Sequence, residues 1–368
     1  MTLSVPLVCP PSLAQCILSL INFSLLVTQP SFTCHPPVTL FLFPIHHRDT
    51  FARFVCIYCD GLTQNPTARP WWWFRCSGLL RAYELLICHC PNLPTTMSVL
   101  LNLWLHIPTG LRLQVYQVWI RRGLWLYGPT SSRRCFRLPF NLYAKTGLNV
   151  FMSEANAMRY ITKNTTISIP SVIDAIQIPT GAFIVMTRMA GEPLTGGLRK
   201  MSAKERSLLA SDLKNSFDQL RSIPAPSTGP HICGIGGGSF RCFRISSDYI
   251  GPFATGPDFY RFLYERVYLQ ERSRLEQFAH EVHNTSYRIC LSHNDLNPHN
   301  ILIDNNCWLS AIVDWECSTW LPAYWDYTRS YFHRDAYYEW QYLMDNVFGL
   351  WPKELRVEKE LWKFNDPF

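Results

Sequence analysis

The sequence has no charged residue before Arg48, and acidic residues stay rare over the next hundred positions. Residues 1–150 contain 12 Lys and Arg against only three Asp and Glu, so this part carries a net charge of +9. Residues 151–368 contain 22 basic and 24 acidic residues, a net charge of −2. The +7 of the whole chain therefore comes from the N-terminal part, and it gives no reason to expect nucleic-acid binding by the remainder.

An apolar run long enough to cross a membrane is also missing. The stretch Leu13–Val27 is apolar over about 15 residues, whereas a helix that spans a bilayer needs about 20. No basic residue precedes it, although signal peptides begin with one. We therefore expect a cytoplasmic protein without a membrane partner. The less favoured alternative, a membrane-anchored protein, depends only on residues 13–45.

The cysteines lack the paired spacing of a zinc module. Nine of the 14 fall at or before Cys135. Cys56 and Cys59 form a CxxC pair, which can place two thiolates on one ion, but a zinc module needs a second pair at a workable distance. Cys76, Cys88 and Cys90 do not supply one, so we interpret these cysteines as unrelated to a metal. The five later cysteines are expected to be buried thiols of a cytosolic protein.

Sustained helical or strand periodicity is absent before about residue 111. We therefore expect residues 1–130 to be an atypical segment that is poorly ordered or was translated from outside the true coding start. The folded domain is expected over residues 131–368, with an N-lobe over 131–188 and a C-lobe over 192–368.

From about residue 131, turn and capping signals separate clear elements. Ser202 and Glu205 form a capping box at the start of an apolar helix. The Pro-Thr-Gly at 179–181 joins two apolar runs as a hairpin. The order of strands first and helices afterwards predicts an α+β protein, with a small sheet-bearing lobe and a larger helical lobe. The expected elements are a strand over 137–145, a helix capped by Ser153, a hairpin over 171–189, a helix from Ser202, a helix over 258–283, and strands at 301–303 and 310–313.

The segment Ser-His-Asn-Asp-Leu-Asn-Pro-His-Asn-Ile, residues 292–301, has the composition of a phosphoryl-transfer loop. Asp295 precedes Asn300 by five residues, and Asp314 follows in Ala-Ile-Val-Asp-Trp-Glu. Phosphoryl transfer needs a carboxylate to accept the proton of the acceptor hydroxyl, and oxygen ligands that hold Mg²⁺ against the nucleotide phosphates. A loop followed by a hairpin brings the three side chains to one point. Each residue alone is typical of a turn, but the set indicates catalysis.

The motifs HNDLNPHNIL and IVDWE resemble those of the aminoglycoside phosphotransferase and choline kinase-like family, especially its fungal members, and more distantly those of protein kinases. The resemblance implies a bilobal, protein-kinase-like fold that uses ATP and Mg²⁺. It implies that Asp295 is the catalytic base and that His293 braces the catalytic loop. It also implies that Asn300 and Asp314 hold Mg²⁺, with Glu316 near the metal.

Upstream residues follow the order of the same family. Lys145 matches the lysine that contacts the nucleotide phosphates, and Glu154 matches the helix carboxylate that pairs with it. The segment Val-Met-Thr-Arg-Met resembles the hinge between the lobes, whose backbone binds adenine, and it assigns Met186, Thr187 and Met189 to the ATP site.

The chain departs from the family pattern before Lys145. The family places several strands and a nucleotide-covering loop ahead of its lysine, and residues 111–134 are a poor match for them. Whether the N-lobe sheet is complete or truncated stays open. The glycine-rich stretch at 234–239 comes too late in the sequence to be that loop, so we expect it to be a loop near the substrate. The competing hypothesis is a pseudokinase or binding protein with a truncated N-lobe.

The region after Asp314 is rich in aromatic and acidic residues. Aromatic faces and carboxylates suit a cationic or aromatic small molecule that carries a hydroxyl, and both choline-like and aminoglycoside-like acceptors stay open. The alternative is a helical lobe packed with aromatic side chains. The residues concerned are Trp315, Trp320, Tyr324, Trp325, Tyr327, Tyr331, Tyr337, Tyr338 and Trp340, with Asp326, Asp335, Glu339 and Asp345 among them.

Overall fold

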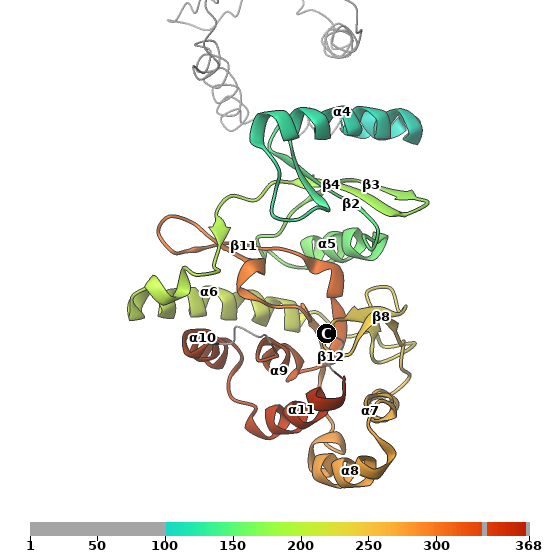
Figure 1. The fold of residues 1–368 in the computed structure, drawn as a ribbon, viewed down its shortest axis with the longest axis vertical. Coiled ribbons are helices and arrows are strands. Elements are labelled where there is room, and N and C mark those ends of the chain that lie inside the picture. The colour runs from blue at the N-terminus through green and yellow to red at the C-terminus, as the bar shows by residue number, and fades with distance from the viewer. Residues whose placement is uncertain (1–100, 333–336, 366–368) are drawn as a thin grey trace, which may run out of the picture. The chain divides into compact units, whose positions relative to one another are not determined.

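The computed structural model describes residues 101–332 and 337–365 (Figure 1). The apolar stretch Leu13–Val27, the Cys56–Cys59 pair and Asp335 lie outside the described residues, so the expectations about them stay predictions. Within the described ranges, no helix is both long enough and apolar enough to cross a membrane.

A four-stranded antiparallel sheet forms the N-lobe, in the order β1-β2-β4-β3. Its strands are β1 (Cys135–Leu138), β2 (Leu142–Gly147), β3 (Val172–Ile178) and β4 (Gly181–Thr187). The single strand expected over 137–145 is in fact the β1–β2 hairpin, because Phe140 and Asn141 both adopt positive φ and turn the chain. The hairpin expected over 171–189 is confirmed. Its strands β3 and β4 pair from Val172 opposite Met186 to Ile178 opposite Gly181.

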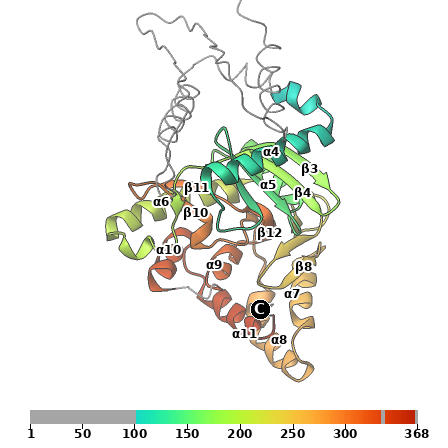
Figure 2. The same cartoon turned by 45° about the horizontal axis from the view of Figure 1, so that its top comes forward.

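The two faces of the sheet pack against different helices. On β4, Phe183 and Val185 pack with residues of α4 (Thr109–Tyr127), whereas Ile184 and Met186 pack with residues of α5 (Met152–Asn164). Figure 1 shows α4 and α5 on either side of the strands, and Figure 2 shows the same elements after a turn of 45°. Successive side chains of a strand alternate between faces, and Lys145 of β2 is paired with Ile184. Lys145 therefore faces α5.

Helix α4 extends the folded unit before the boundary expected at residue 131. Arg112 donates to Asp174 of β3, and the Tyr116 hydroxyl donates to the same carboxylate oxygen at 2.9 Å. Gly123 allows close packing, because a Cβ there would lie only 1.8 Å from the carbonyl oxygen of Arg137. Part of the segment predicted to be poorly ordered is thus a helix that covers the sheet.

Two predicted helix starts need correction. Helix α5 begins at Met152 with Phe151 as N-cap, and the Ser153 hydroxyl contacts that of Tyr249 at 3.1 Å instead of capping the helix. The helix expected over 258–283 is two helices, α7 (Gly256–Glu265) and α8 (Leu269–His283), and Thr255 caps the first by accepting from Asp258 N. The capping box of Ser202 and Glu205 is confirmed at α6.

The C-lobe is mainly helical, with short strands that hold the functional segments. Strand β12 pairs with β9 and β6, and β10 pairs with β11 and β5, so the residues before and after the catalytic loop belong to different small sheets. The remaining elements are β5 (Glu192–Pro193), η1 (Leu198–Lys200), α6 (Ala203–Ser222), β6 (Cys233–Gly234), β7 (Phe240–Cys242), β8 (Ser246–Ile250), α7 (Gly256–Glu265), α8 (Leu269–His283), β9 (Ile289–Ser292), η2 (Pro298–Asn300), β10 (Ile301–Ile303), β11 (Leu309–Ile312), η3 (Trp315–Cys317), β12 (Thr319–Pro322), α9 (Trp325–Ser330), α10 (Tyr338–Phe348) and α11 (Pro352–Asn365).

Candidate active site

The loop between β9 and η2, which carries the expected base Asp295, is fixed by the buried side chain of Asn294. Its amide nitrogen donates to the carbonyl oxygens of Arg241 (2.8 Å) and Cys317 (3.1 Å), and its oxygen accepts from Trp325 Nε1 at 2.8 Å. Its backbone N–H donates to Asp326 at 2.9 Å. Asn294 adopts φ 61°, a left-handed conformation that asparagine tolerates better than most residues. These bonds hold the backbone that presents Asp295.

His293 has both ring nitrogens engaged with the backbone. Nε2 lies 3.0 Å from the carbonyl oxygen of Val313, and Nδ1 accepts from Asp295 N at 3.3 Å. Burial lowers the pKa of His293 to about 4, so the ring is neutral and donates through Nε2. The geometry fits the brace expected from the sequence, because the ring links the catalytic loop to the residue before Asp314.

One oxygen of the Asp295 carboxylate accepts hydrogen bonds from two side chains. Arg329 Nη2 of α9 lies 2.5 Å from Oδ1, and Asn297 Nδ2 lies 2.9 Å from the same oxygen. Burial raises the pKa of Asp295 to about 6, although Arg329 acts in the opposite direction. The backbone oxygen of Asp295 accepts from Asn300 Nδ2 at 2.9 Å. The expected base and the expected amide ligand are therefore directly connected.

Asp314 begins the turn that follows β11, and its φ of 65° is again left-handed. Such strain persists only where the surroundings enforce it, and it is common at functional sites. The turn is held on one side, since Val313 N donates to the carbonyl of Asn300 at 2.9 Å. The side chain of Asp314 keeps 32% of its surface exposed. Burial alone would raise the pKa of Asp314, but the nearby Lys145 ammonium lowers it below its usual value.

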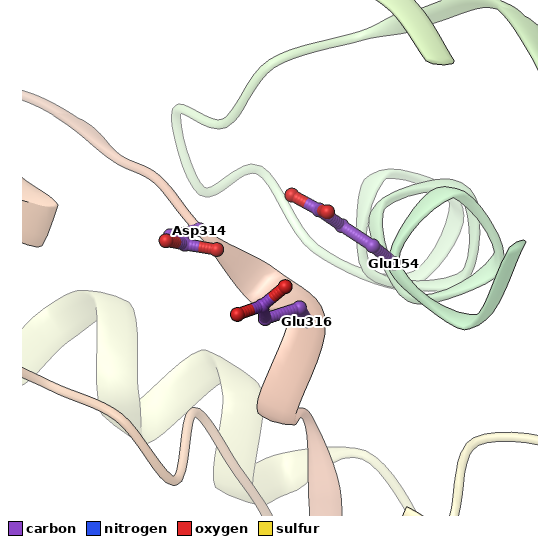
Figure 3. A group of neighbouring side chains, drawn as sticks. All are labelled: Glu154, Asp314 and Glu316. Carbon is purple, nitrogen blue, oxygen red and sulfur yellow. The ribbon is translucent and has the colours of Figure 1, made fainter. Parts of the chain in front are cut away.

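Lys145 is surrounded by three carboxylates. Its Nζ lies 2.9 Å from Glu154 Oε2, 2.8 Å from Asp314 Oδ1 and 3.5 Å from Glu316 Oε2. Burial would lower the pKa of Lys145, but the three carboxylates, Glu154 foremost, raise it well above its usual value. Figure 3 shows Glu154 reaching from α5 toward the segment that carries Asp314 and Glu316. The structure thus brings residues from both lobes to one point.

The carboxylate and amide oxygens at this point are suitable ligands for Mg²⁺. Ligand oxygens of Glu154, Asp314 and Glu316 lie within 4.8 Å of one another. Asn300 uses its amide nitrogen on Asp295, which leaves its side-chain oxygen as an acceptor. Carboxylate and amide oxygens are the protein ligands that Mg²⁺ prefers. Glu154 is the least suitable of the group, because its side chain is only 2% exposed, against 7% for Glu316 and 32% for Asp314.

The expected hinge residues occupy different environments. Met186 is buried in the core that β4 shares with α5, and Thr187 is paired with Leu142 of β2. The Thr187 hydroxyl lies 3.9 Å from Met189 Sδ. Gly191 follows with φ 98°, where a Cβ would lie 2.6 Å from the carbonyl oxygen of Ile303. Contact of this segment with adenine stays a prediction.

Four residues shape the site in ways that the sequence did not predict: Asn294, Arg329 and Arg241 had no assigned role, and Asp326 was named only among the carboxylates that could suit a cationic substrate. Arg329 lies 34 positions beyond Asp295, on another element, so no local pattern connects them. Arg241 lies on β7 directly after the glycine-rich stretch, and its Nη1 is 3.8 Å from Glu316 Oε2. Asn294 was the easiest of the four to predict, because asparagine is a frequent turn former that tolerates the left-handed conformation.

Most aromatic residues after Asp314 belong to the core. Trp315, Trp320, Trp325 and Trp340 are each at most 2% exposed. The alternative of a lobe packed with aromatic side chains therefore describes these residues correctly. Among the aromatic residues named from the sequence, Tyr338 is the strongly exposed one, at 75%.

A model of the phosphotransferase enzyme family matches residues 132–342, more than half of the chain. The chain belongs to this family. The match confirms the resemblance drawn from the HNDLNPHNIL and IVDWE motifs, the α+β kinase-like fold and the expected enzyme class, a small-molecule kinase. The specific likeness to fungal members stays a prediction, as do the roles of individual residues.

The chain is also similar to solved structures of phosphotransferases. A thermostable mutant of aminoglycoside phosphotransferase APH(4)-Ia is 15% identical over 64% of this chain and 83% of that one, with a TM-score of 0.44. The gentamicin complex of APH(2″)-IIa is 18% identical over 62% and 76%, with a TM-score of 0.41. Macrolide 2′-phosphotransferase MphH from Brachybacterium faecium is 15% identical over 62% and 78%, with a TM-score of 0.39. No curated protein matches the chain.

Proposed function

We propose that this protein is a cytoplasmic, ATP- and Mg²⁺-dependent phosphotransferase that acts on a hydroxyl group of a small molecule. One observation carries the proposal. Asn300 is hydrogen-bonded both to Asp295 and to Val313, the residue before Asp314, and Asp314 is 2.8 Å from a lysine that is paired with Glu154. A base, oxygen ligands and a phosphate-binding cation are the parts that phosphoryl transfer requires.

In this proposal Asp295 accepts the proton of the acceptor hydroxyl. The hydroxyl oxygen bonds to the γ-phosphorus while the bond from that phosphorus to the bridging oxygen breaks and ADP leaves. Arg329 stabilises the ionised carboxylate, which has to be unprotonated to act as a base. Asn297 donates to the same oxygen, so the other carboxylate oxygen is left for the acceptor.

Lys145 is the proposed phosphate-binding residue, and Glu154 holds its ammonium on the inner face of the sheet. Asn300, Asp314 and Glu316 are the proposed Mg²⁺ ligands, since their oxygens match the preference of this ion. Mg²⁺, when bound, offsets the negative charge that the phosphates carry during transfer. Met186, Thr187 and Met189 stay the proposed adenine contacts.

A pseudokinase with a truncated N-lobe is the second candidate. Within the described residues, one strand of the sheet, β1, precedes the strand that carries Lys145, and residues 101–134 contain no glycine-rich loop. Support for the acceptor being cationic or aromatic is weak, because the tryptophans that suggested it are buried. The acceptor class is therefore proposed only as a hydroxyl-bearing small molecule.

A coupled assay of ADP release tests the proposal. The full chain is incubated with Mg²⁺ and ATP against a panel of aminoglycosides, macrolides, choline-like amines and simple sugars. We expect at least one acceptor to raise ADP release, and Asp295→Asn to reduce that rate by about 10²–10⁴-fold with nucleotide affinity retained. Asp218→Asn, an exposed carboxylate on α6, is the matched control. Full activity in Asp295→Asn contradicts the assignment of the base.

A further inference from the structure

Arg134, in the segment before β1, reaches across to the C-lobe part of the site. Its Nη1 lies 4.0 Å from Glu316 Oε2. The backbone around it is fixed, because Thr146 N donates to the carbonyl oxygen of Arg134 at 2.9 Å. The Thr130 hydroxyl also bonds the carbonyl oxygen of Cys135 at 2.7 Å. Arg134 is thus tied to the end of β2, one residue from Lys145.

Three cations share a single carboxylate oxygen at this point. Glu316 Oε2 lies 3.5 Å from Lys145 Nζ, 3.8 Å from Arg241 Nη1 and 4.0 Å from Arg134 Nη1. The two arginine distances exceed the range of a hydrogen bond. Arg241 is 5% exposed, and its buried Nε has no hydrogen-bond partner. The positive groups around this oxygen therefore have more donors than one carboxylate can use.

The two arginines differ in exposure and in the number of their contacts. The side chain of Arg134 is 39% exposed, so its long contact with Glu316 is easily exchanged for another anion. Arg241 is held by the rings of Phe151 and Tyr249 and donates to the carbonyl oxygen of Asn149 at 3.2 Å. A guanidinium presents paired donors that match phosphate oxygens, which a lysine does not.

We propose that Arg134, together with Arg241, binds the terminal phosphates of the nucleotide and takes the place of a glycine-rich covering loop, which the described residues before Lys145 do not contain. This inference rests on the proposed function. When the nucleotide binds, Arg134 leaves Glu316 and donates to the phosphate oxygens. The Glu316 carboxylate is then available to the metal. Arg134 therefore holds the phosphates from the side of the sheet.

Calorimetric titration of the full chain with MgATP tests this role, with Arg134→Gln, Arg134→Lys and Arg133→Gln as variants. Arg133 is the matched control, because it is the adjacent arginine and is exposed. We expect Arg134→Gln to weaken MgATP binding about tenfold or more, as for the loss of a charged hydrogen bond, and Arg134→Lys to recover part of it. Arg133→Gln should stay within about twofold. AMP, measured by competition, should bind all variants equally, since it lacks the terminal phosphates.

Two results overturn the inference alone: unchanged MgATP affinity in Arg134→Gln, or an equal loss for MgATP and AMP. Absence of MgATP binding by the wild type overturns the proposed function as well, so the two failures are distinguishable. The melting temperature of each variant, recorded without nucleotide, identifies a loss of affinity that comes from unfolding. If Arg134→Gln has a lowered melting temperature, the test depends on Arg134→Lys. An MgATP affinity of Arg134→Lys that equals that of Arg133→Gln then contradicts the proposal.

Discussion

The two halves of the site are held in place by different kinds of interaction. The loop half, residues 292–316, is fixed by hydrogen bonds between buried side chains and backbone, and Asn294 and Asp314 are among its left-handed residues. The lysine half, Arg134, Lys145 and Glu154, meets it through ion pairs. Hydrogen bonds to backbone fix one geometry, whereas ion pairs can be exchanged for other charges. We infer that the loop half is preformed and that the lysine half adjusts when nucleotide binds.

The largest effect is expected in the loop half. Asp314→Ala removes a proposed metal ligand and should reduce phosphoryl transfer by about 10³-fold, or about 4 kcal/mol, in the ADP-release assay. Asp304→Ala is the control, because Asp304 lies in the exposed turn of the same β10–β11 hairpin. Equal activity of the two variants would remove Asp314 from the metal site.

Lys145→Met tests the charge balance of the lysine half. Glu154 is 2% exposed and would lose its partner, so we expect the free energy of unfolding at pH 7 to fall by about 3 kcal/mol. In the wild type the pKa of Lys145 is raised, so its contribution is complete below its unfolded pKa and is lost only as pH rises through the folded value. Its removal raises the pKa of the buried carboxylates, so the variant should regain stability as pH falls.

Urea unfolding at pH 5 and pH 7 measures this change, with exposed Lys204→Met as control. Mg²⁺ should stabilise Lys145→Met more than the wild type, because no ammonium competes for the carboxylates. A variant that is as stable as the wild type at pH 7 contradicts the charge balance.

A smaller effect is expected from the ion pair that links α9 to the loop half. The pKa of Asp295 is about 6, so kcat/KM should fall on the acid side with a midpoint near pH 6, where the base becomes protonated. Arg329→Gln removes the group that lowers this pKa, and the midpoint should move up by about one pH unit, or about 1.4 kcal/mol. Arg329→Lys should restore most of the shift. Profiles that coincide in wild type and Arg329→Gln would show that Arg329 has no influence on the base.

The smallest effect concerns a feature outside both halves. Ser202→Ala removes the capping box of α6 and should lower the free energy of unfolding by about 1 kcal/mol. MgATP affinity should not change, since α6 contributes no residue to the proposed site. A coupled loss of affinity would mean that general stability, and not the two halves, determines binding.

The residues of the loop half could be predicted from the sequence to lie together, because they are close in the chain. Asp295 and Asn300 are five positions apart, and Asp314 follows after one hairpin, so local structure alone brings them together. The capping box at Ser202 was likewise correct because it depends only on neighbouring residues.

The contacts of the lysine half were harder to predict from the sequence, because tertiary packing determines them. Lys145 and Glu154 were recognised only by their order in the chain. Arg134 and Arg329 contact residues that are far away in sequence, and no periodicity reports such contacts. The hairpin at Phe140 and the packing of α4 through Gly123 depend on positive φ and on close backbone approach. Neither leaves a pattern that hydrophobic spacing reveals.

The central claim is most directly tested by a thermal-shift titration of the full chain with ATP, once with Mg²⁺ and once with EDTA. If the loop half binds the ion and the lysine half binds the phosphates, ATP at 100 times its Kd should stabilise the protein by about 2.7 kcal/mol with Mg²⁺. The stabilisation should be much smaller with EDTA. No shift under either condition, or an equal shift under both, would contradict the account of a metal-dependent phosphotransferase.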